Sequence, residues 1–463
     1  MSETLEHRLL ARIDADHEAA VGRLVDWLRI PSVSAQPAHA GDCLAAAEWV
    51  AAELRAIGFT ARLVPTARHP VVVATHPGTA PGPRLLYYGH YDVQPAEPFE
   101  LWTSPPFEPA RVAGPHGPRL VARGAVDDKG QTLMWIEAMR AWHAEAGGPP
   151  CPILAVIEGE EEIGSPNLDA MLAAHAPELA ADAAIISDTG MWDIDVPAIT
   201  TRLRGLVYTQ LDLKAASRDL HSGQYGGAAL NPLNLITRIL GQLHAPNGAV
   251  AIPGFYDGVA DIDPGLRAVW QKLDYSEHDF LGGIGLSVPV GEADRSPLER
   301  LWARPTADIN GIWGGYTGDG SKTVIASEAH AKVSFRLVPG QDPARIYQLF
   351  QDFVRARLPA DAQASFQLFG AAPGFVVDER TPTMQAAIAA LTAEFDRPPA
   401  LIGGGGSIPV VESLKRILGL DTVLMGFGLE DDQVHSPNEK FELACFHRGT
   451  RSHARLLARI AGN

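Results

Sequence analysis

Strand-like and helix-like runs alternate along the first two hundred residues, and this alternation constrains the fold more than any other feature. Apolar runs such as "HPVVVATH", "RLLYYGHYDV" and "CPILAVIEG" are separated by segments with apolar residues at helical spacing, among them residues 44–59 and 127–145. Strands that alternate with helices predict a mostly parallel sheet with helices on both faces. The same pattern returns from about residue 373.

The sequence between these two parts has a different character. "RGLVYTQLDLKA" and "AHAKVSFRLVPG" alternate like strands with one exposed face, and two helical patterns accompany them. Residues 245–320 are rich in glycine and proline and are predicted to be irregular. We therefore predict an α/β fold with one discontinuous domain, residues 1–200 and 373–463, and an inserted α+β domain, residues 201–372.

Charge and cysteine content exclude several classes of protein. The chain has 463 residues and a net charge of −17, which argues against nucleic acid or an anionic membrane as a partner. Its three cysteines, Cys43, Cys151 and Cys445, form no CxxC pair. A disulfide framework or a thiolate metal site is therefore not expected.

The first twenty residues are charged and helix-patterned. They contain no apolar core of the kind that a signal peptide requires, and no window approaches 18 uninterrupted apolar residues. We therefore expect a cytoplasmic protein without a membrane partner.

Acidic residues and histidines gather where the predicted strands end. The stretch "IEGEEEIGS" (157–165) places four glutamates directly after an apolar run, although like charges repel one another and are costly to bury. Ligand sites in open α/β sheets form at the carboxyl ends of strands. Further candidates at such ends are His90, Asp92, Asp127, Asp128, Asp188 and His435.

Two imidazoles with several carboxylates suit a pair of Zn²⁺ or Mn²⁺ ions. Taken singly, each signal has an ordinary alternative. A lone histidine is usually a surface or core residue, an Asp pair at a helix start is usually a cap, and a glutamate run is usually a solvated face. Their recurrence at five strand ends favours a metal pair as the positive partner of the glutamates.

Six ordered motifs make the chain resemble a known family. "GHYDVQP", "RGAVDDKGQ", "EGEEEIGS", "ISDT", "DLHSGQYGG" and "VHSPNE" resemble the di-metal peptidases that include carboxypeptidase G, acetylornithine deacetylase, succinyl-diaminopimelate desuccinylase and carnosinase-type dipeptidases. The motifs run from residue 90 to 439, and the greatest similarity is to the cytosolic non-specific dipeptidases. The resemblance implies metal-dependent hydrolysis of dipeptides in a catalytic domain, with the insert as a lid or dimerisation domain.

The resemblance also implies a set of ligands for two divalent ions, zinc or manganese. Asp127 would bridge the two ions. His90 and Glu162 would complete one coordination shell, and Asp188 and His435 the other, although the resemblance leaves open which ligand serves which ion.

Further roles follow from the resemblance for neighbouring residues. Glu161 would be the general base, and Asp92 would orient His90, as metal-bound imidazoles generally require. The peptide bond between Asp127 and Asp128 would be cis. Glu158 and Glu160 have no assigned role, and contact with water or hydrogen bonds behind the ligands are both possible for them.

The insert would supply contacts to the substrate. His221 would cross a homodimer to stabilise the oxyanion in the partner's site, unless it packs locally within the insert. Asn310 would help to hold that oxygen, with turn formation as the alternative. Arg336 would bind the substrate's carboxylate, with a surface salt bridge as the alternative, and Ser407 would provide a second carboxylate contact.

The sequence alone leaves other functions open. The insert is long, which favours dipeptides over the N-acyl-amino-acid or carbamoyl substrates of related amidohydrolases. A non-catalytic binding relative is a further alternative. Such a protein would have no reason to keep Glu161 beside a complete ligand set.

Overall fold

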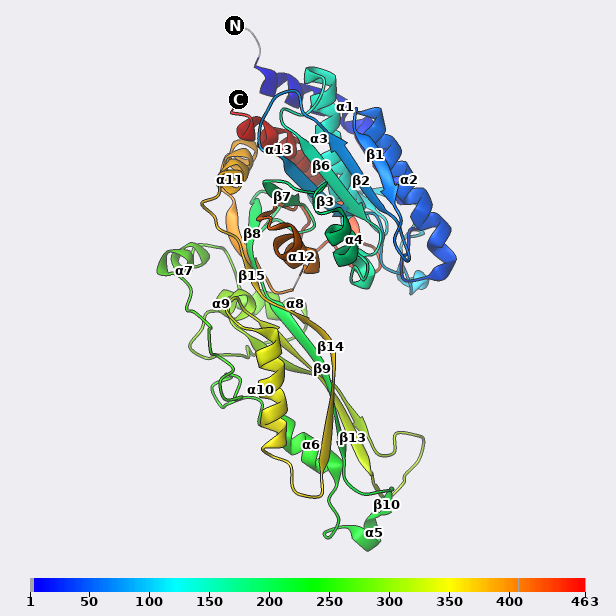
Figure 1. Cartoon of the computed structure of the whole chain (residues 1–463), viewed down its shortest axis with the longest axis vertical. Helices are drawn as coiled ribbons and strands as arrows, with labels where there is room; N and C mark the ends of the chain where they lie inside the picture. Colours follow the sequence, from blue (N-terminus) through cyan, green and yellow to red (C-terminus); the bar gives the residue numbers. More distant parts are fainter. Residues whose placement is uncertain (1–3, 407, 463) are drawn as a thin grey trace. The chain divides into compact units, whose positions relative to one another are not determined.

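The computed structural model describes residues 4–406 and 408–462, and within it the chain divides into two compact units (Figure 1). The first unit comprises residues 1–201, 377–402 and 409–463. The second comprises residues 202–376 and 403–408. The catalytic and dimerisation roles expected for the two parts of the chain stay predictions.

The main sheet has the order β1, β2, β6, β3, β7, β17 and β8, and β16 also pairs with β8. β15 pairs with residues 202–203 at the end of β8, and both of these short segments fall in the second unit. The strands of this sheet are β1 (Thr60–Val64), β2 (Val71–His76), β3 (Leu85–His90), β6 (Ile153–Glu158), β7 (Ala183–Ile186), β8 (Ala198–Leu203), β15 (Phe375–Val376), β16 (Ala400–Gly404) and β17 (Thr422–Leu424). The predicted α/β class, with helices flanking the sheet, is confirmed.

The sheet is mixed and not mostly parallel, which corrects one detail of the prediction. β6, β3, β7 and β17 are parallel. The pairs β1–β2, β2–β6 and β17–β8 are antiparallel. A buried strand has the same apolar pattern whether it pairs in parallel or antiparallel, so the sequence pattern does not reveal strand direction. The link between β1 and β2, residues 65–70, is too short for the crossover that a parallel pair requires.

Seven α-helices of the first unit are α1 (Leu5–Leu28), α2 (Ala40–Ala56), α3 (Lys129–Ala146), α4 (Leu168–His175), α11 (Pro382–Phe395), α12 (Pro409–Leu418) and α13 (Leu443–Ile460). α3 packs against α1, α13 and β3, while α4 packs against α12. Tyr87 of β3 and Trp135 of α3 stack with their ring centroids 4.2 Å apart. α3 ends at Gly147, whose φ of 77° favours glycine.

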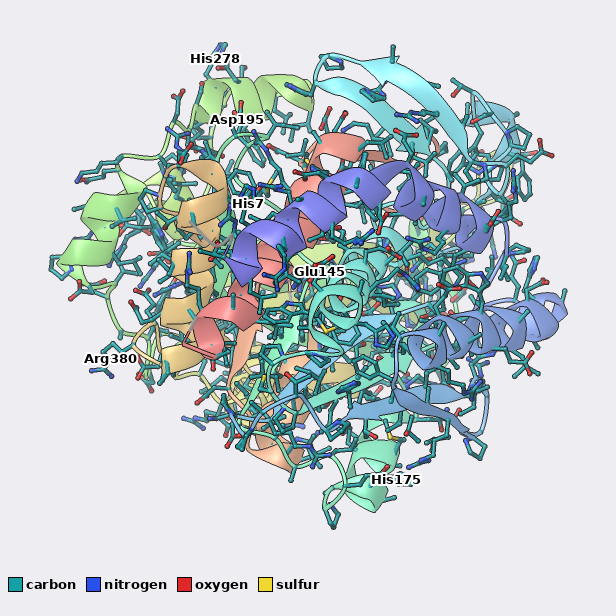
Figure 2. The ribbon with its side chains drawn as sticks, turned by 90° about the horizontal axis from the view of Figure 1, so that it is seen from above. His7, Glu145, His175, Asp195, His278 and Arg380 are labelled. Atoms are coloured by element: carbon teal, nitrogen blue, oxygen red, sulfur yellow. The ribbon has the colours of Figure 1, made fainter. Side chains whose placement is uncertain are left out.

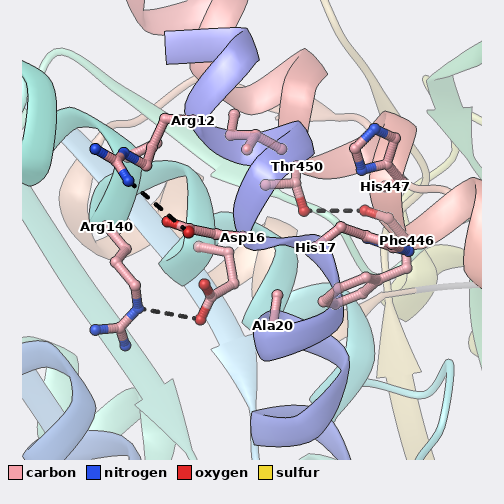
Figure 3. A pocket seen from close by; sticks show the side chains of 11 residues that line it. Arg12, Asp16, His17, Ala20, Arg140, Phe446, His447 and Thr450 are labelled. Carbon is pink, nitrogen blue, oxygen red and sulfur yellow. Dashed lines mark hydrogen bonds and ion pairs between the residues drawn. The ribbon is translucent and has the colours of Figure 1, made fainter. Parts of the chain in front are cut away.

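Ion pairs reinforce the packing of α1 against α3 and α13. Arg12 donates to Glu145 of α3 at 3.1 Å, and Glu145 is labelled in Figure 2. Arg12, Asp16 and Arg140 also line a small pocket between these helices (Figure 3). None of the predicted metal ligands lines this pocket, so we interpret it as part of the helix packing.

Smaller elements complete the first unit. A three-stranded sheet has the order β18 (Lys440–Glu442), β5 (Gly117–Val121) and β4 (Ala110–Gly114). The short 3₁₀ helices are η1 (Pro37–His39), η2 (Phe99–Leu101) and η3 (Glu161–Ile163). Within the described residues of the whole chain, none of the helices combines the length and the apolar character that crossing a bilayer requires.

The second unit is built on an antiparallel sheet in the order β11, β13, β9 and β14. Its strands are β9 (Gly205–Lys214), β10 (Leu220–His221), β11 (Thr306–Gly314), β12 (Val324–Ile325), β13 (Glu328–Leu337) and β14 (Gln363–Ala372). Its helices are α5 (Ser222–Tyr225), α6 (Pro232–Leu240), α7 (Pro264–Trp270), α8 (Glu277–Gly283), α9 (Pro297–Trp302) and α10 (Pro343–Arg355).

One face of this four-stranded sheet is buried and the other is open. Side chains alternate between buried and partly exposed along β9 and β13, and the buried set, such as Phe335, packs with residues of α6 and α10. The region predicted to be irregular, 245–320, contains the short helices α7, α8 and α9 as well as β11, so that prediction was wrong for these elements. For β11 the reason is a bulge between Ile309 and Gly311, which interrupts the alternation of its side chains.

Candidate metal centre

The predicted ligands of the first unit follow the strands in the parallel centre of its sheet. His90 is the last residue of β3, and Asp188 lies two residues beyond β7. Glu162 lies in η3 just after β6, and His435 lies in the segment between β17 and β18. Because parallel strands end at the same edge of a sheet, these side chains are brought to one place.

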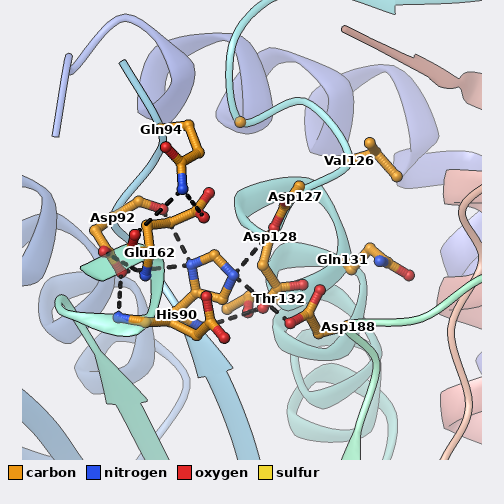
Figure 4. A network of polar contacts seen from close by, with 12 residues as sticks. His90, Asp92, Gln94, Val126, Asp127, Asp128, Gln131, Thr132, Glu162 and Asp188 are labelled. Carbon is orange, nitrogen blue, oxygen red and sulfur yellow. Dashed lines mark hydrogen bonds and ion pairs between the residues drawn. The ribbon is translucent and has the colours of Figure 1, made fainter. Parts of the chain in front are cut away.

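Five side chains form two groups, each of a size that could hold a metal ion, and the groups share Asp127. His90, Asp127 and Asp188 form one group, called here the strand-end triad; Asp127, Glu162 and His435 form the other, called the loop triad. Within each triad the ligand atoms lie within 4.8 Å of one another. Figure 4 shows four of these side chains, those of His90, Asp127, Glu162 and Asp188.

The two oxygens of the shared carboxylate face different histidines. Asp127 Oδ1 lies 3.1 Å from His90 Nε2, and Asp127 Oδ2 lies 3.0 Å from His435 Nε2. His435 Nε2 also lies 3.1 Å from Glu162 Oε2. A carboxylate that presents one oxygen to each group has the arrangement needed to bridge two ions.

The grouping of the side chains differs from the division of ligands that the resemblance suggested, which had left open which ligand serves which ion. The resemblance pairs His90 with Glu162 and Asp188 with His435, whereas the triads pair His90 with Asp188 and Glu162 with His435. β3 lies between β6 and β7, so the sheet order places Glu162 and Asp188 on opposite sides of His90 but does not decide which of them joins it. That order is not visible in the sequence.

Asp92 holds the backbone of η3 as well as lying beside His90. Its carboxylate accepts hydrogen bonds from the N–H groups of Glu161 at 3.2 Å and Glu162 at 3.1 Å, and from the Ser34 hydroxyl at 2.6 Å. His90 Nδ1 lies 3.0 Å from the Asp92 backbone oxygen and 3.4 Å from its carboxylate. Asp92 therefore positions the predicted base and one ligand.

The other two glutamates of "IEGEEEIGS", Glu158 and Glu160, are buried and hydrogen-bonded. Glu158 accepts from the Tyr88 hydroxyl at 2.5 Å and from the Ser165 hydroxyl at 2.9 Å. Glu160 accepts from Asn167 Nδ2 at 2.6 Å and also from the 66–69 segment. Both residues thus fasten the loops around the metal ligands, and contact with water is not their role.

Burial and hydrogen bonds shift the pKa values of the charged groups of the site. Burial raises the pKa of Glu161 to about 9 and that of Asp188 to about 7. Hydrogen bonds to Asp127 and Glu162 raise the pKa of His435 to about 10. Burial disfavours the Asp127 carboxylate, but hydrogen bonds from His435 and His90 hold its pKa well below the usual value.

These residues fit a pair of divalent ions. Imidazole nitrogens and carboxylate oxygens are donors that Zn²⁺ and Mn²⁺ accept. Several buried acids that share one place repel one another, and two cations would remove that repulsion. The Asp127–Asp128 peptide bond is cis, as predicted. Asp128 accepts from the His90 N–H at 3.0 Å and from the Thr132 hydroxyl at 2.7 Å, which holds it behind the ligands.

The predicted substrate contacts belong to the second unit. His221 is exposed, and its Nδ1 accepts from the Gly223 N–H at 3.0 Å. Asn310 is the exposed extra residue of the β11 bulge, and Arg336 is half-buried on the open face of β13. Ser407 lies outside the described residues.

Sequence reasoning gave no role to several residues that support the ligands. Gln94 Nε2 donates to Glu162 Oε2 at 2.9 Å. Gln131 links the chain beyond β7 to the chain beyond β17, donating to the Thr189 carbonyl and accepting from the Phe427 N–H. Glu439 bonds to the loop before Asp127. Glu439 ends the motif "VHSPNE", which was the one signal that could have drawn attention to it.

The fold and the two triads define an α/β protein with a candidate metal-binding site. The chain belongs to peptidase family M20/M25/M40, whose pattern matches residues 86–459. It is 30% identical to the Cys-Gly metallodipeptidase dug1 of Schizosaccharomyces pombe, and the match covers 96% of each chain. It is 28% identical to the Beta-Ala-His dipeptidase of Rattus norvegicus, covering 96% of this chain and 94% of the relative.

Solved structures show the same similarity. The dipeptidase Dug1p of Saccharomyces cerevisiae superposes with a TM-score of 0.83 at 27% identity, covering 100% of both chains. Human carnosine dipeptidase 1 superposes with a TM-score of 0.81 at 26% identity, again covering 100% of both. The family resemblance is confirmed, and with it the class of enzyme, a metal-dependent hydrolase of peptide bonds.

Proposed function

We propose that the protein hydrolyses the peptide bond of dipeptides, using two divalent ions held by the strand-end triad and the loop triad. The observation that carries this proposal is the Asp127 carboxylate, which presents one oxygen to the histidine of each triad. The relatives named as dipeptidases support dipeptides as the substrate class.

Zinc or manganese fits the mixed imidazole and carboxylate ligands. When bound, such a pair of ions would lower the pKa of a water molecule and polarise the scissile carbonyl.

Glu161 is proposed as the general base. It belongs to neither triad, and Asp92 holds its backbone N–H at 3.2 Å. Burial raises the pKa of its carboxyl group to about 9. Glu161 would take a proton from the attacking water and pass it to the leaving amine, a task for a carboxylate that is near the ions but not bound to them.

The second unit is proposed to recognise the substrate and to form the dimer. With Nδ1 of His221 accepting a hydrogen bond, Nε2 carries the proton and is able to donate to an oxyanion. Among the described residues no carboxylate forms an ion pair with Arg336, so its guanidinium remains available for a substrate carboxylate. Asn310 and Ser407 keep their predicted contacts to the carbonyl oxygen and the carboxylate.

Exposed apolar side chains support a homodimer through the second unit. Ile309, Ile312 and Trp313 on β11, and Leu368 and Phe369 on β14, are each 40–46% exposed. β11 and β14 are the outer strands of their sheet. Large apolar residues on outer strands favour contact with another chain. A cytoplasmic location remains part of the proposal, and cell fractionation would test it.

A substrate panel tests the proposed reaction. Metal-free protein is loaded with Zn²⁺, Mn²⁺ or Co²⁺ and assayed with dipeptides, including Cys-Gly and β-Ala-His, and with matched N-acetyl and N-carbamoyl amino acids. We expect dipeptides to give the highest kcat/KM. A preference for the N-acyl or N-carbamoyl substrates would instead support a deacylase or carbamoyl hydrolase. The absence of turnover with every substrate and metal would support a non-catalytic binding relative.

A further inference from the structure

Glu439 connects the chain segments that carry two of the metal ligands. It lies four residues beyond His435, and its buried carboxylate accepts four hydrogen bonds from residues 123–127. Oε1 accepts from the N–H groups of Val126 at 3.0 Å and Asp127 at 3.1 Å. Oε2 accepts from the Gly124 N–H at 2.9 Å and from Arg123 Nη1 at 2.8 Å.

Arg123 balances the charge of this buried carboxylate. Its side chain is also almost fully buried, lies 5.5 Å from the Trp102 ring and donates to the Pro95 carbonyl at 3.2 Å. Glu439 is thus paired and fully hydrogen-bonded. Such an arrangement fixes a segment in one conformation, and removing one partner leaves buried donors without an acceptor.

The segment of Glu439 is held by polar contacts more than by packing. The side chain of His435 is 54% exposed, whereas that of His90 is fully buried at the end of β3. Asn438 accepts from the Thr103 N–H at 2.7 Å and donates to the Leu101 carbonyl at 2.9 Å. The place of His435 therefore depends on hydrogen bonds made by its neighbours in sequence.

We propose that Glu439 is a positioning residue that holds the bridging Asp127 and the His435 segment in one arrangement. The ion of the loop triad then depends on Glu439 more than the ion of the strand-end triad does. This inference rests on the proposed two-ion site but not on the proposed substrate, since it concerns metal binding alone.

The substitution Glu439→Gln tests the role with little change in size. An amide has one accepting oxygen, and its nitrogen donates, so two of the four donors lose their acceptor. Removing such support behind a metal ligand typically weakens metal binding about 10–100-fold.

Zinc binding is measured by titrating metal-free protein in competition with a chromophoric chelator. We expect two binding steps in the unaltered protein, and His435→Ala identifies the step that belongs to the loop triad. In Glu439→Gln that step weakens by about 10–100-fold, while the other step changes less. Glu137→Gln is the matched control, because Glu137 is a buried carboxylate paired with Arg23 that touches no ligand segment.

Asn438→Gly provides a second test if Glu439→Gln does not fold. Asn438 has a positive φ of 65°, which glycine tolerates, so the change removes the side-chain bonds without forcing the backbone. We expect it to weaken the same step. The inference is overturned if Glu439→Gln, or Asn438→Gly where the former does not fold, leaves both steps unchanged or weakens both equally. Neither result depends on which substrate the enzyme cleaves.

Discussion

The predicted residues of the first unit contact one another, whereas those of the second unit face solvent. Asp127 lies within 3.1 Å of both His90 and His435. By contrast, His221 and Asn310 are exposed, and among the described residues Arg336 forms no ion pair. The fold therefore assembles the predicted metal ligands in advance, while the proposed substrate contacts remain available for a bound molecule or a second chain.

This difference predicts two kinds of mutant. Substitutions around the triads should change metal binding or the chemical step. Substitutions on the second unit should leave the metals in place and change substrate binding or the contribution of the partner chain. The predictions below test that separation, from the largest expected effect to the smallest.

Glu161→Gln should lower kcat by about 10²–10⁴-fold, because it removes the proton acceptor without removing a ligand. Metal content, measured by mass spectrometry after dialysis, should stay at that of the unaltered protein. Loss of metal together with activity would show that Glu161 is a ligand and not the base.

Arg336→Met should lower kcat/KM for dipeptides by about 10–100-fold, because a charge-assisted contact to the substrate carboxylate is lost. The loss should be much smaller for a dipeptide amide, which has no terminal carboxylate. Lys332→Met is the control, since Lys332 is a cation on the same face of β13 and lies near Phe369. An equal loss for acid and amide substrates would refute the role of Arg336.

Mixing two inactive variants tests whether the active sites are shared between chains. If His221 serves the partner's site, a dimer of His221→Ala and Glu161→Gln chains has one site with both defects and one with neither. With random pairing, activity should return to about a quarter of the unaltered level. No recovery, once subunit exchange has been demonstrated, would mean that His221 acts within its own chain.

The buried His453, which lies behind the strand-end triad, should make the stability of the fold fall as the pH falls. It is buried, lies 2.9 Å from the Ser187 hydroxyl, and burial lowers its pKa to about 3. Above pH 6.5 both the folded and the unfolded chain leave it neutral. Between about pH 6.5 and 3 only the unfolded chain binds the proton, so stability falls as the pH falls, by up to about 1.4 kcal/mol per pH unit.

Chemical denaturation of the metal-free protein between pH 4 and 7 measures this dependence. His453→Gln should be less stable than the unaltered protein at pH 7 and should lose less stability on acidification. His116→Gln is the control, because His116 is exposed in the turn between β4 and β5. An identical pH slope in His453→Gln and the unaltered protein would count against the buried neutral histidine.

The positions of His90, Glu162 and Asp188 could be predicted because each closely follows an apolar run that reads as a buried strand. "RLLYYGHYDV" places His90 at a strand end in this way. The grouping of the ligands could not be predicted, because it depends on the paths of the loops that follow the strands as well as on the order of the strands. Sequence spacing carries no information on the order of strands in a sheet.

Contacts that depend on backbone geometry also could not be predicted from the sequence. The bulge that exposes Asn310 removes the alternation by which β11 would have been found. Glu439 acts largely through N–H groups of residues 124–127, which every residue except proline possesses, so the motif "VHSPNE" could draw attention to Glu439 but could not reveal its partners.

Anomalous diffraction from zinc-loaded crystals of Glu161→Gln tests the central claim most directly. We predict two zinc peaks per chain on either side of the Asp127 carboxylate, one bound by His90 and Asp188 and the other by Glu162 and His435. A single peak, or two peaks that do not share Asp127, would contradict the two-ion site.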